Sequence, residues 1–166
     1  MIIRSETPED IAVISEVTIA AFSDHPISNH TEQFIINALR RANALTISLV
    51  AEIDGKIAGH IAFSPIRISD GSTGWYGLGP VSVLPELQRQ GIGTALVLKG
   101  ISMLKEIGGQ GCALVGYPDY YKRFGFKNNP DLIHEGIPQE FFLVLHFYEN
   151  IAKGKVEFHE SFLATR

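Results

Sequence analysis

Cysteine is almost absent from this 166-residue chain, since Cys112 is the only one. A single cysteine forms no internal disulfide and builds no cysteine-rich metal site, and Cys112 reads as a small buried hydrophobe rather than a nucleophile. The six histidines never form a His-x-x-x-His pair or stand beside spaced carboxylates, so we expect no metal site. Ser64 and Ser82 lack the Gly-x-Ser-x-Gly context of a serine hydrolase.

Long apolar runs and an excess of positive charge are missing too. No stretch approaches 18 consecutive apolar residues, and the polar start MIIRSETPED has no signal-peptide core. The formal net charge is -4 and the basic residues are scattered, which argues against a nucleic-acid partner. We therefore expect a cytoplasmic protein with no membrane or nucleic-acid partner, and we leave a homodimer open.

Strand and helix patterns alternate along the chain, without repeats or linkers, which predicts a single α+β domain over residues 1–166. Helices are expected over 7–22, with Thr7 as the cap, over 29–42, after residue 91, and over 118–124, ended by Gly125. Strands are expected over 1–5, 78–85 and 111–116, and a hairpin that turns at Asp54-Gly55 is expected over 46–68. Residues 70–77 are expected to form a turn-rich connection, and one or two closing strands are expected within 140–149 and 155–162.

The junction LQRQGIG, residues 87–93, joins an expected strand to an expected helix. A helix that opens directly after a strand presents unpaired backbone N–H groups and the positive end of its dipole, which together bind anions. Gly91 and Gly93 allow an anion to approach the backbone closely, while Gln88, Arg89 and Gln90 add donors. The pattern predicts a phosphate or pyrophosphate site.

The common nucleotide motifs do not fit this junction. A Rossmann fingerprint needs a third glycine where Leu96 stands, and neither Gly55-Lys56 nor Gly154-Lys155 has the context of a Walker loop. Glycines that serve only the packing of a strand-to-helix turn are the alternative, and it stays open at this point.

Two segments of the sequence carry a family resemblance. VSVLPELQRQGIGTAL resembles motif A of the GNAT superfamily of acyl-CoA-dependent N-acyltransferases, and YYKRFGF resembles the second signature of that family, Tyr-x-x-x-Gly-Phe. The order of segments through the closing GKVEFHESF is most similar to the predicted small N-acetyltransferases, over nearly the whole chain. The resemblance implies a mixed, mostly antiparallel central sheet that splays open at the coenzyme site and is flanked by helices.

The resemblance also implies a coenzyme site. The pyrophosphate of coenzyme A would lie on the amides of Arg89 to Thr94, and the pantetheine arm would pair with the strand edge at Val81 to Val83. The implied cofactor-binding residues are Val81, Ser82, Val83, Gln88, Arg89, Gln90, Gly91, Ile92, Gly93 and Thr94.

The catalytic residue that the resemblance implies is Tyr121, whose phenol would protonate the leaving thiolate. A packing role for Tyr121 is the alternative, while Tyr117 and Tyr120 are expected to pack or line the site and Phe124 to pack or flank the coenzyme. The ammonium group of the acceptor must also lose a proton before its nitrogen can attack the thioester. Glu52, His60, Asp24 and His25 are the candidates for that base, and none is assigned.

The resulting hypothesis is an acyltransferase that uses acetyl-CoA as cosubstrate, without a metal. It transfers the acetyl group to a primary amine, on a small molecule or a protein, directly within a ternary complex, since no cysteine or serine is placed as a nucleophile. A non-catalytic module that senses acyl-CoA is the alternative.

Overall fold

Nine strands and four α-helices alternate along the chain, and the computed structural model describes all of residues 1–166. The strands are β1 (Ile2–Ser5), β2 (Ile47–Ile53), β3 (Lys56–Pro65), β4 (Arg67–Ile68), β5 (Trp75–Val83), β6 (Gly111–Val115), β7 (Leu132–Ile133), β8 (Phe142–His146) and β9 (Gly154–Glu157). The α-helices are α1 (Ile11–Phe22), α2 (Glu32–Arg41), α3 (Ile92–Glu106) and α4 (Pro118–Tyr121).

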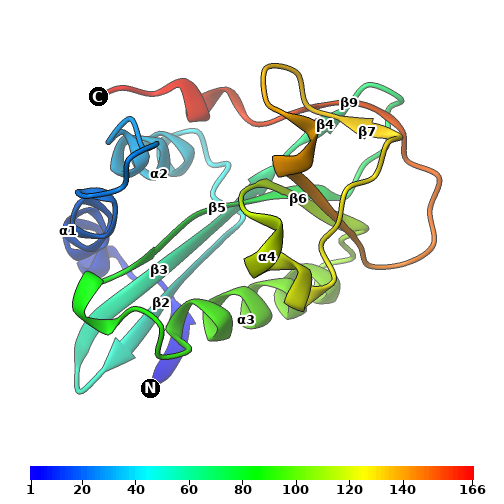
Figure 1. The fold of residues 1–166 in the computed structure, drawn as a ribbon. Coiled ribbons are helices and arrows are strands. Elements are labelled where there is room, and N and C mark those ends of the chain that lie inside the picture. Colours follow the sequence, from blue (N-terminus) through cyan, green and yellow to red (C-terminus); the bar gives the residue numbers. More distant parts are fainter.

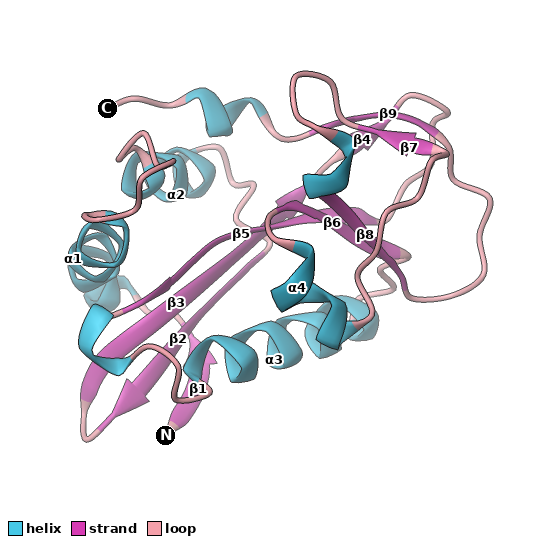
Figure 2. Ribbon diagram, in the orientation of Figure 1, coloured by secondary structure: helices cyan, strands magenta, loops and turns pink.

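Six strands form one sheet through the middle of the molecule, in the order β1-β2-β3-β5-β6-β8 (Figure 1). Every neighbouring pair in this sheet is antiparallel except β5 and β6. Helices α1 and α2 lie on one face of the sheet and α3 lies on the other (Figure 2). The predicted α+β fold with a mixed, mostly antiparallel sheet is thus confirmed.

Local sequence signals set the ends of several elements. Asp54 and Gly55 both have positive φ, +51° and +77°, as a two-residue type I′ turn requires, and they join β2 to β3 as predicted. Thr7 begins the first helical segment, a 3-10 turn over Pro8–Asp10 that continues into α1, and its N–H donates to the Asp10 carboxylate at 2.7 Å. Gly125, at φ +93°, ends the turn after α4.

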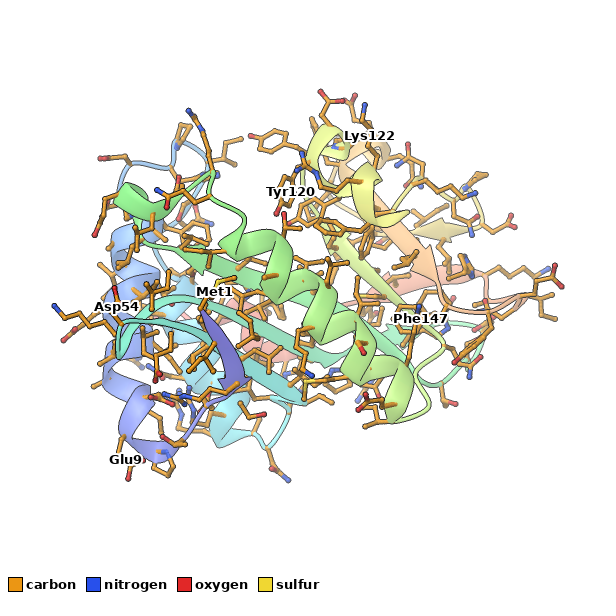
Figure 3. The ribbon with its side chains drawn as sticks, turned by 90° about the horizontal axis from the view of Figure 1, so that it is seen from below. Met1, Glu9, Asp54, Tyr120, Lys122 and Phe147 are labelled. Atoms are coloured by element: carbon orange, nitrogen blue, oxygen red, sulfur yellow. The ribbon has the colours of Figure 1, made fainter.

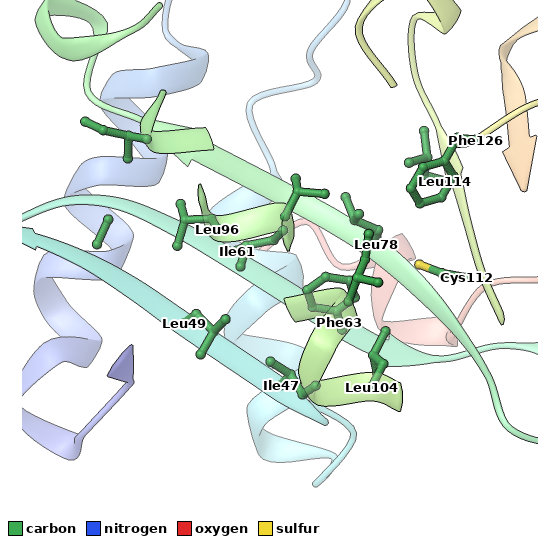
Figure 4. Close-up of a cluster of buried hydrophobic side chains, with 14 of the residues drawn as sticks. Ile47, Leu49, Ile61, Phe63, Leu78, Leu96, Leu104, Cys112, Leu114 and Phe126 are labelled. Atoms are coloured by element: carbon green, nitrogen blue, oxygen red, sulfur yellow. The ribbon is translucent and has the colours of Figure 1, made fainter. Parts of the chain in front are cut away.

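The largest hydrophobic cluster lies between α3 and the sheet (Figure 4). Leu96 and Leu104 of α3 are fully buried with Phe63 of β3, and burying each such side chain contributes about 1.5–3 kcal/mol. Gly100 lets α3 approach the Phe63 ring, because a Cβ there would lie 2.1 Å from Phe63 Cε2. Cys112 belongs to the same cluster, and burial raises its pKa, so it is inert as predicted.

Strands β5 and β6 separate after a short paired segment. Their parallel pairing covers only Trp75–Gly77 of β5 opposite Gly111–Ala113 of β6. Beyond this segment, the register of β5 against β3 shifts at Gly79 and Pro80, opposite Ala62 of β3. Pro80 also has no N–H to donate to a neighbouring strand. The remainder of β5 therefore stays paired with β3 alone, and the sheet opens on its β6 side.

A second sheet, in the order β4-β9-β7, was not predicted. Its buried side chains, such as Leu132 and Val156, pack against Phe142 of β8 and Ala113 of β6. The expected turn over 70–77 is also wrong in its last three residues: Trp75–Gly77 belong to β5 because they pair with β6, and Trp75 is buried. Of the expected closing strands, β8 joins the central sheet and β9 the second one.

Candidate functional site

The turn before α3 carries a run of unused backbone donors. None of the six N–H groups from Arg89 to Thr94 donates a hydrogen bond within the protein, and the first N–H to find an intrahelical acceptor is that of Ala95, which donates to Gly91 O at 3.0 Å. Arg89 and Gly91 both have positive φ, +64° and +88°. Consecutive free amides in such a turn at a helix N-terminus form an anion-binding concavity.

Side chains around this turn leave the amides accessible. A Cβ on Gly91 would meet no atom within 4 Å, whereas one on Gly93 would lie 3.3 Å from the Tyr120 hydroxyl and 3.8 Å from Val83 Cγ2. Ile92 turns its side chain into the core, so only its backbone faces the turn. Gln88, Arg89 and Gln90 are exposed.

Tyr120 places a hydroxyl beside the predicted anion site, which the sequence did not indicate. Its hydroxyl lies 3.3 Å from Thr94 Oγ1, and Figure 3 shows its side chain near the first turn of α3. The Arg123 guanidinium stacks over the Tyr120 ring, with Cζ 4.4 Å from the ring centroid. Tyr-Tyr before the Gly-Phe signature is the only sequence feature that marks Tyr120, and it does not tell which tyrosine faces α3.

The edge of β5 that faces away from β3 is unpaired at Val81 and Val83. Leu84 N–H donates to Ala58 O of β3, so antiparallel alternation directs the main-chain groups of Ser82 toward β3 and those of Val81 and Val83 away from it. Gln88 Nε2 donates to Val83 O at 3.1 Å from that open side. The Ser82 side chain is buried on the far side of the strand and does not line the cavity described next.

A cavity of about 1480 Å³ occupies the opening between β5 and β6. Its inner wall includes Val81, Val83 and Gln88 of the β5 segment and Gly116 and Tyr121 beyond β6. Its outer wall comes from the α1–α2 connection and the C-terminal segment, with Phe22, His25, Ile27, Glu32, Glu157, Phe158, His159, Glu160, Phe162 and Leu163. The C-terminal turn Glu160–Leu163 is held in place by Phe162, which packs against the small hydrophobic cluster of Ile35, Leu39 and Ala44.

Tyr121 lines the cavity from α4. Its ring packs edge-on against Tyr120 and Phe126, with centroids 4.9 and 5.9 Å away, and its hydroxyl has no hydrogen-bond partner within the protein. Burial raises the pKa of Tyr121 to about 12. The phenol is therefore protonated across the whole neutral range. Phe124 does not line the cavity and packs against both tyrosines.

Of the four base candidates, the structure brings only His25 to the cavity. Glu52 lies on β2 and is paired with Arg4, with Nη2 to Oε1 at 3.1 Å. Asp24 is exposed and lies outside the cavity wall. His60 is fully buried, with Nε2 2.7 Å from Ser48 Oγ, and burial lowers its pKa to about 4.

Two histidines that sequence reasoning missed, His134 and His159, also line the cavity. His134 follows the two-residue strand β7, outside every predicted element, and His159 lies within the expected closing strand over 155–162 but in the structure precedes the C-terminal turn. No group of three or more His, Cys, Asp or Glu side chains gathers anywhere in a way that could hold a metal ion. No helix is long and apolar enough to span a bilayer.

Known proteins match the chain in sequence and in structure. Residues 12–126 match the Acetyltransferase (GNAT) family. The uncharacterized N-acetyltransferase YhbS of Escherichia coli strain K12 is 33% identical over 128 residues, which cover 76% of this chain and 74% of that protein.

Two solved structures match almost the whole chain. A GNAT family acetyltransferase from Brucella melitensis in complex with acetyl-CoA is 47% identical, with a TM-score of 0.87 and 97% of each chain covered. YhbS from Escherichia coli in complex with CoA is 30% identical, with a TM-score of 0.90, covering 99% of this chain and 95% of that one. The family match, the relatives and the fold agree: this chain belongs to the GNAT family and is an acyltransferase of the N-acetyltransferase type.

Proposed function

We propose that the protein transfers an acetyl group from acetyl-CoA to a primary amine by direct transfer within a ternary complex. The observation that carries the proposal is the run of six free amides from Arg89 to Thr94 beside the unpaired edge of β5, where a Cβ on Gly93 would lie 3.8 Å from Val83 Cγ2. A pyrophosphate fits the amides, and an amide-bearing arm fits the strand edge at Val81 and Val83. Two similar solved structures hold acetyl-CoA or CoA.

The cavity supports the chemistry. Amine attack on a thioester places negative charge on the carbonyl oxygen, and a fixed main-chain N–H on the open edge of β5 stabilises such charge. Tyr121 is the proposed acid for the departing thiolate, because its phenol is protonated and has no other hydrogen-bond partner. Burial raises the pKa of Tyr121, and it also raises the pKa of the nearby Cys112 thiol. The same desolvation would make the thiolate of the leaving coenzyme a stronger base beside Tyr121 than it is in water.

Direct transfer is favoured over a covalent acyl-enzyme. The lone cysteine is fully buried, and neither it nor Ser64 or Ser82 lines the cavity. The acceptor amine would enter from the outer wall, where the carboxylates of Glu32, Glu157 and Glu160 outnumber Arg67, the one Arg or Lys that lines the cavity, and leave a net negative charge that suits a cationic amine.

Calorimetric titration with acetyl-CoA, followed by a panel of primary amines assayed for thiol release, tests the proposal. We expect saturable binding and a rise in melting temperature, since ligand at about 100 times its dissociation constant adds about 2.7 kcal/mol to the free energy of unfolding. We also expect thiol release with at least one amine. Tight binding without acetylation of any amine supports an acyl-CoA sensor instead, and absence of binding contradicts both readings.

A further inference from the structure

We infer that His134 is the general base of this transfer and accepts the proton of the acceptor amine on Nε2. The inference rests on the proposed function and names the group that the four candidates from the sequence failed to supply. Three observations carry it: where the imidazole lies, which of its nitrogens holds the proton, and what the other cavity residues already bind.

The imidazole lies at the point where β5 and β6 separate. It packs between Phe142, with ring centroids 5.6 Å apart, and Phe158, at 4.8 Å and nearly perpendicular. Phe142 pairs with Val115 at the end of β6. The Phe158 ring packs on Gly77, the last β5 residue that pairs with β6, because a Cβ on Gly77 would lie 2.9 Å from the Phe158 ring. His134 thus lines the same cavity as Tyr121, next to the opening of the sheet.

The tautomer of His134 is fixed by the backbone. Its Nδ1 lies 2.9 Å from Val156 O, and because a carbonyl only accepts, Nδ1 carries the proton. The basic lone pair is therefore on Nε2, which has no hydrogen-bond partner in the protein. An imidazole oriented in this way through one nitrogen is ready to take a proton on the other.

The other two cavity histidines have the opposite tautomer. Nδ1 of His25 accepts a hydrogen bond from Ile27 N–H at 3.3 Å, and Nδ1 of His159 accepts one from Ser161 N–H at 3.0 Å. Their basic lone pairs are occupied by the backbone, and when neutral they carry the proton on Nε2. Each therefore offers a donor rather than a base to a bound molecule.

Carboxylates around the cavity are less suited to the role. The Ser28 hydroxyl lies 2.7 and 2.8 Å from the two oxygens of Glu32 and shares its one hydrogen between them, and Glu157 and Glu160 are exposed to solvent. The charged groups on the elements next to His134 are Glu135 and Lys155, which pair with each other at 2.7 Å, together with Glu157.

Proton transfer and bond exchange balance in this step. The ammonium of the acceptor gives one proton to Nε2 of His134, which passes it to solvent after the turnover. The neutral nitrogen forms the C–N bond to the acetyl carbon while the C–S bond breaks with its electron pair on sulfur. Tyr121 gives its proton to that thiolate and regains one from the second N–H of the attacking nitrogen, so amide, thiol and one free proton are the products.

The experiment compares His134→Asn and His134→Ala with the wild type at saturating acetyl-CoA, using an amine that the panel has identified. Asn keeps a donor to Val156 O but supplies no base, so we expect turnover to fall by about 10² to 10⁴ while the affinity for acetyl-CoA changes less than about twofold. Added imidazole should restore part of the rate of His134→Ala. The loss should shrink for an aromatic amine, which is already neutral at pH 7.

His146→Asn is the matched control, because His146 is also partly buried and hydrogen-bonded on both nitrogens, to Asn129 and Asn150, but lies outside the cavity. It should keep wild-type turnover. Wild-type turnover in His134→Asn overturns the inference and leaves the proposed function standing, as does a loss that imidazole does not rescue and that is equal for alkyl and aromatic amines. A wild type that binds acetyl-CoA but acetylates no amine defeats the proposed function itself.

Discussion

Replacing Tyr121 by Phe separates catalysis from packing. The substitution removes only a hydroxyl that lacks a hydrogen-bond partner and keeps the ring that packs against Tyr120 and Phe126. Burying an unpaired hydroxyl costs about 1–3 kcal/mol, and the Tyr121 hydroxyl borders the cavity, which reduces this cost. We therefore expect the free energy of unfolding of Tyr121→Phe to equal that of the wild type or exceed it by up to about 1 kcal/mol.

Turnover should respond in the opposite direction. A positioned acid contributes about 10² to 10⁴ in rate, which is about 2.7 to 5.4 kcal/mol of activation free energy. Because the pKa of Tyr121 is about 12, its deprotonation should not lower the wild-type rate below about pH 11, so a descending limb near pH 10 is not expected from this residue.

The assay measures thiol release at saturating acetyl-CoA from pH 6 to 10, with urea unfolding and calorimetry on the same samples. Tyr148→Phe, at an exposed tyrosine outside the cavity, controls for loss of a phenol elsewhere. A Tyr121→Phe variant with wild-type turnover and affinity would refute the reasoning and assign Tyr121 to packing. A Tyr121→Phe variant whose loss of activation free energy is matched by an equal loss of free energy of unfolding would refute it as well.

Three further outcomes follow from the same contacts. Gly93→Ala places a methyl 3.3 Å from the Tyr120 hydroxyl beside the proposed anion site and displaces that hydroxyl by a few tenths of an ångström, so calorimetry should show acetyl-CoA binding weakened by less than about tenfold while the melting temperature is kept. Gly100→Ala forces a Cβ to 2.1 Å from Phe63, so urea unfolding should show a loss of about 1–3 kcal/mol. Burial lowers the pKa of His60 from 6.5 to about 4, so its contribution to stability is complete above pH 6.5 and is lost as the pH falls through 4. Acid unfolding should show this dependence, and it should vanish in His60→Gln.

Sequence reasoning found what local patterns encode. The Asp54-Gly55 turn, the start of the first helix at Thr7 and the glycine turn before α3 at Gly91 each depend on a few adjacent residues whose conformational preferences are strong, while anion binding at that turn stays a prediction. The central sheet followed from those elements together with the family resemblance. The start of β5 at Trp75 was missed because Gly74 and Gly77 read as turn residues, whereas pairing with β6 decides their structure.

The rest of the site depends on contacts between segments far apart in the chain. β4 and β7 have two residues each, too short for any periodicity, so the second sheet was not visible in the sequence. The orientation of His134 depends on the Val156 carbonyl, 22 residues later in the chain, and on the rings of Phe142 and Phe158. His60, which looked accessible on a hairpin, is covered by α1 packing on β3 and β5, and no local pattern reports that burial.

The two halves of the cavity come from different stretches of polypeptide. The family match ends at residue 126, whereas His134, Glu157 and the C-terminal turn Glu160–Leu163 lie beyond it. The donors proposed for the coenzyme are backbone amides, which tolerate exchange of most side chains, while the wall proposed for the acceptor consists of side chains on connections and a terminal segment. If the proposed division holds, substitutions in residues 127–166 and in the α1–α2 connection can change which amine is accepted, while the turn and strand edge proposed for the acetyl donor stay as they are.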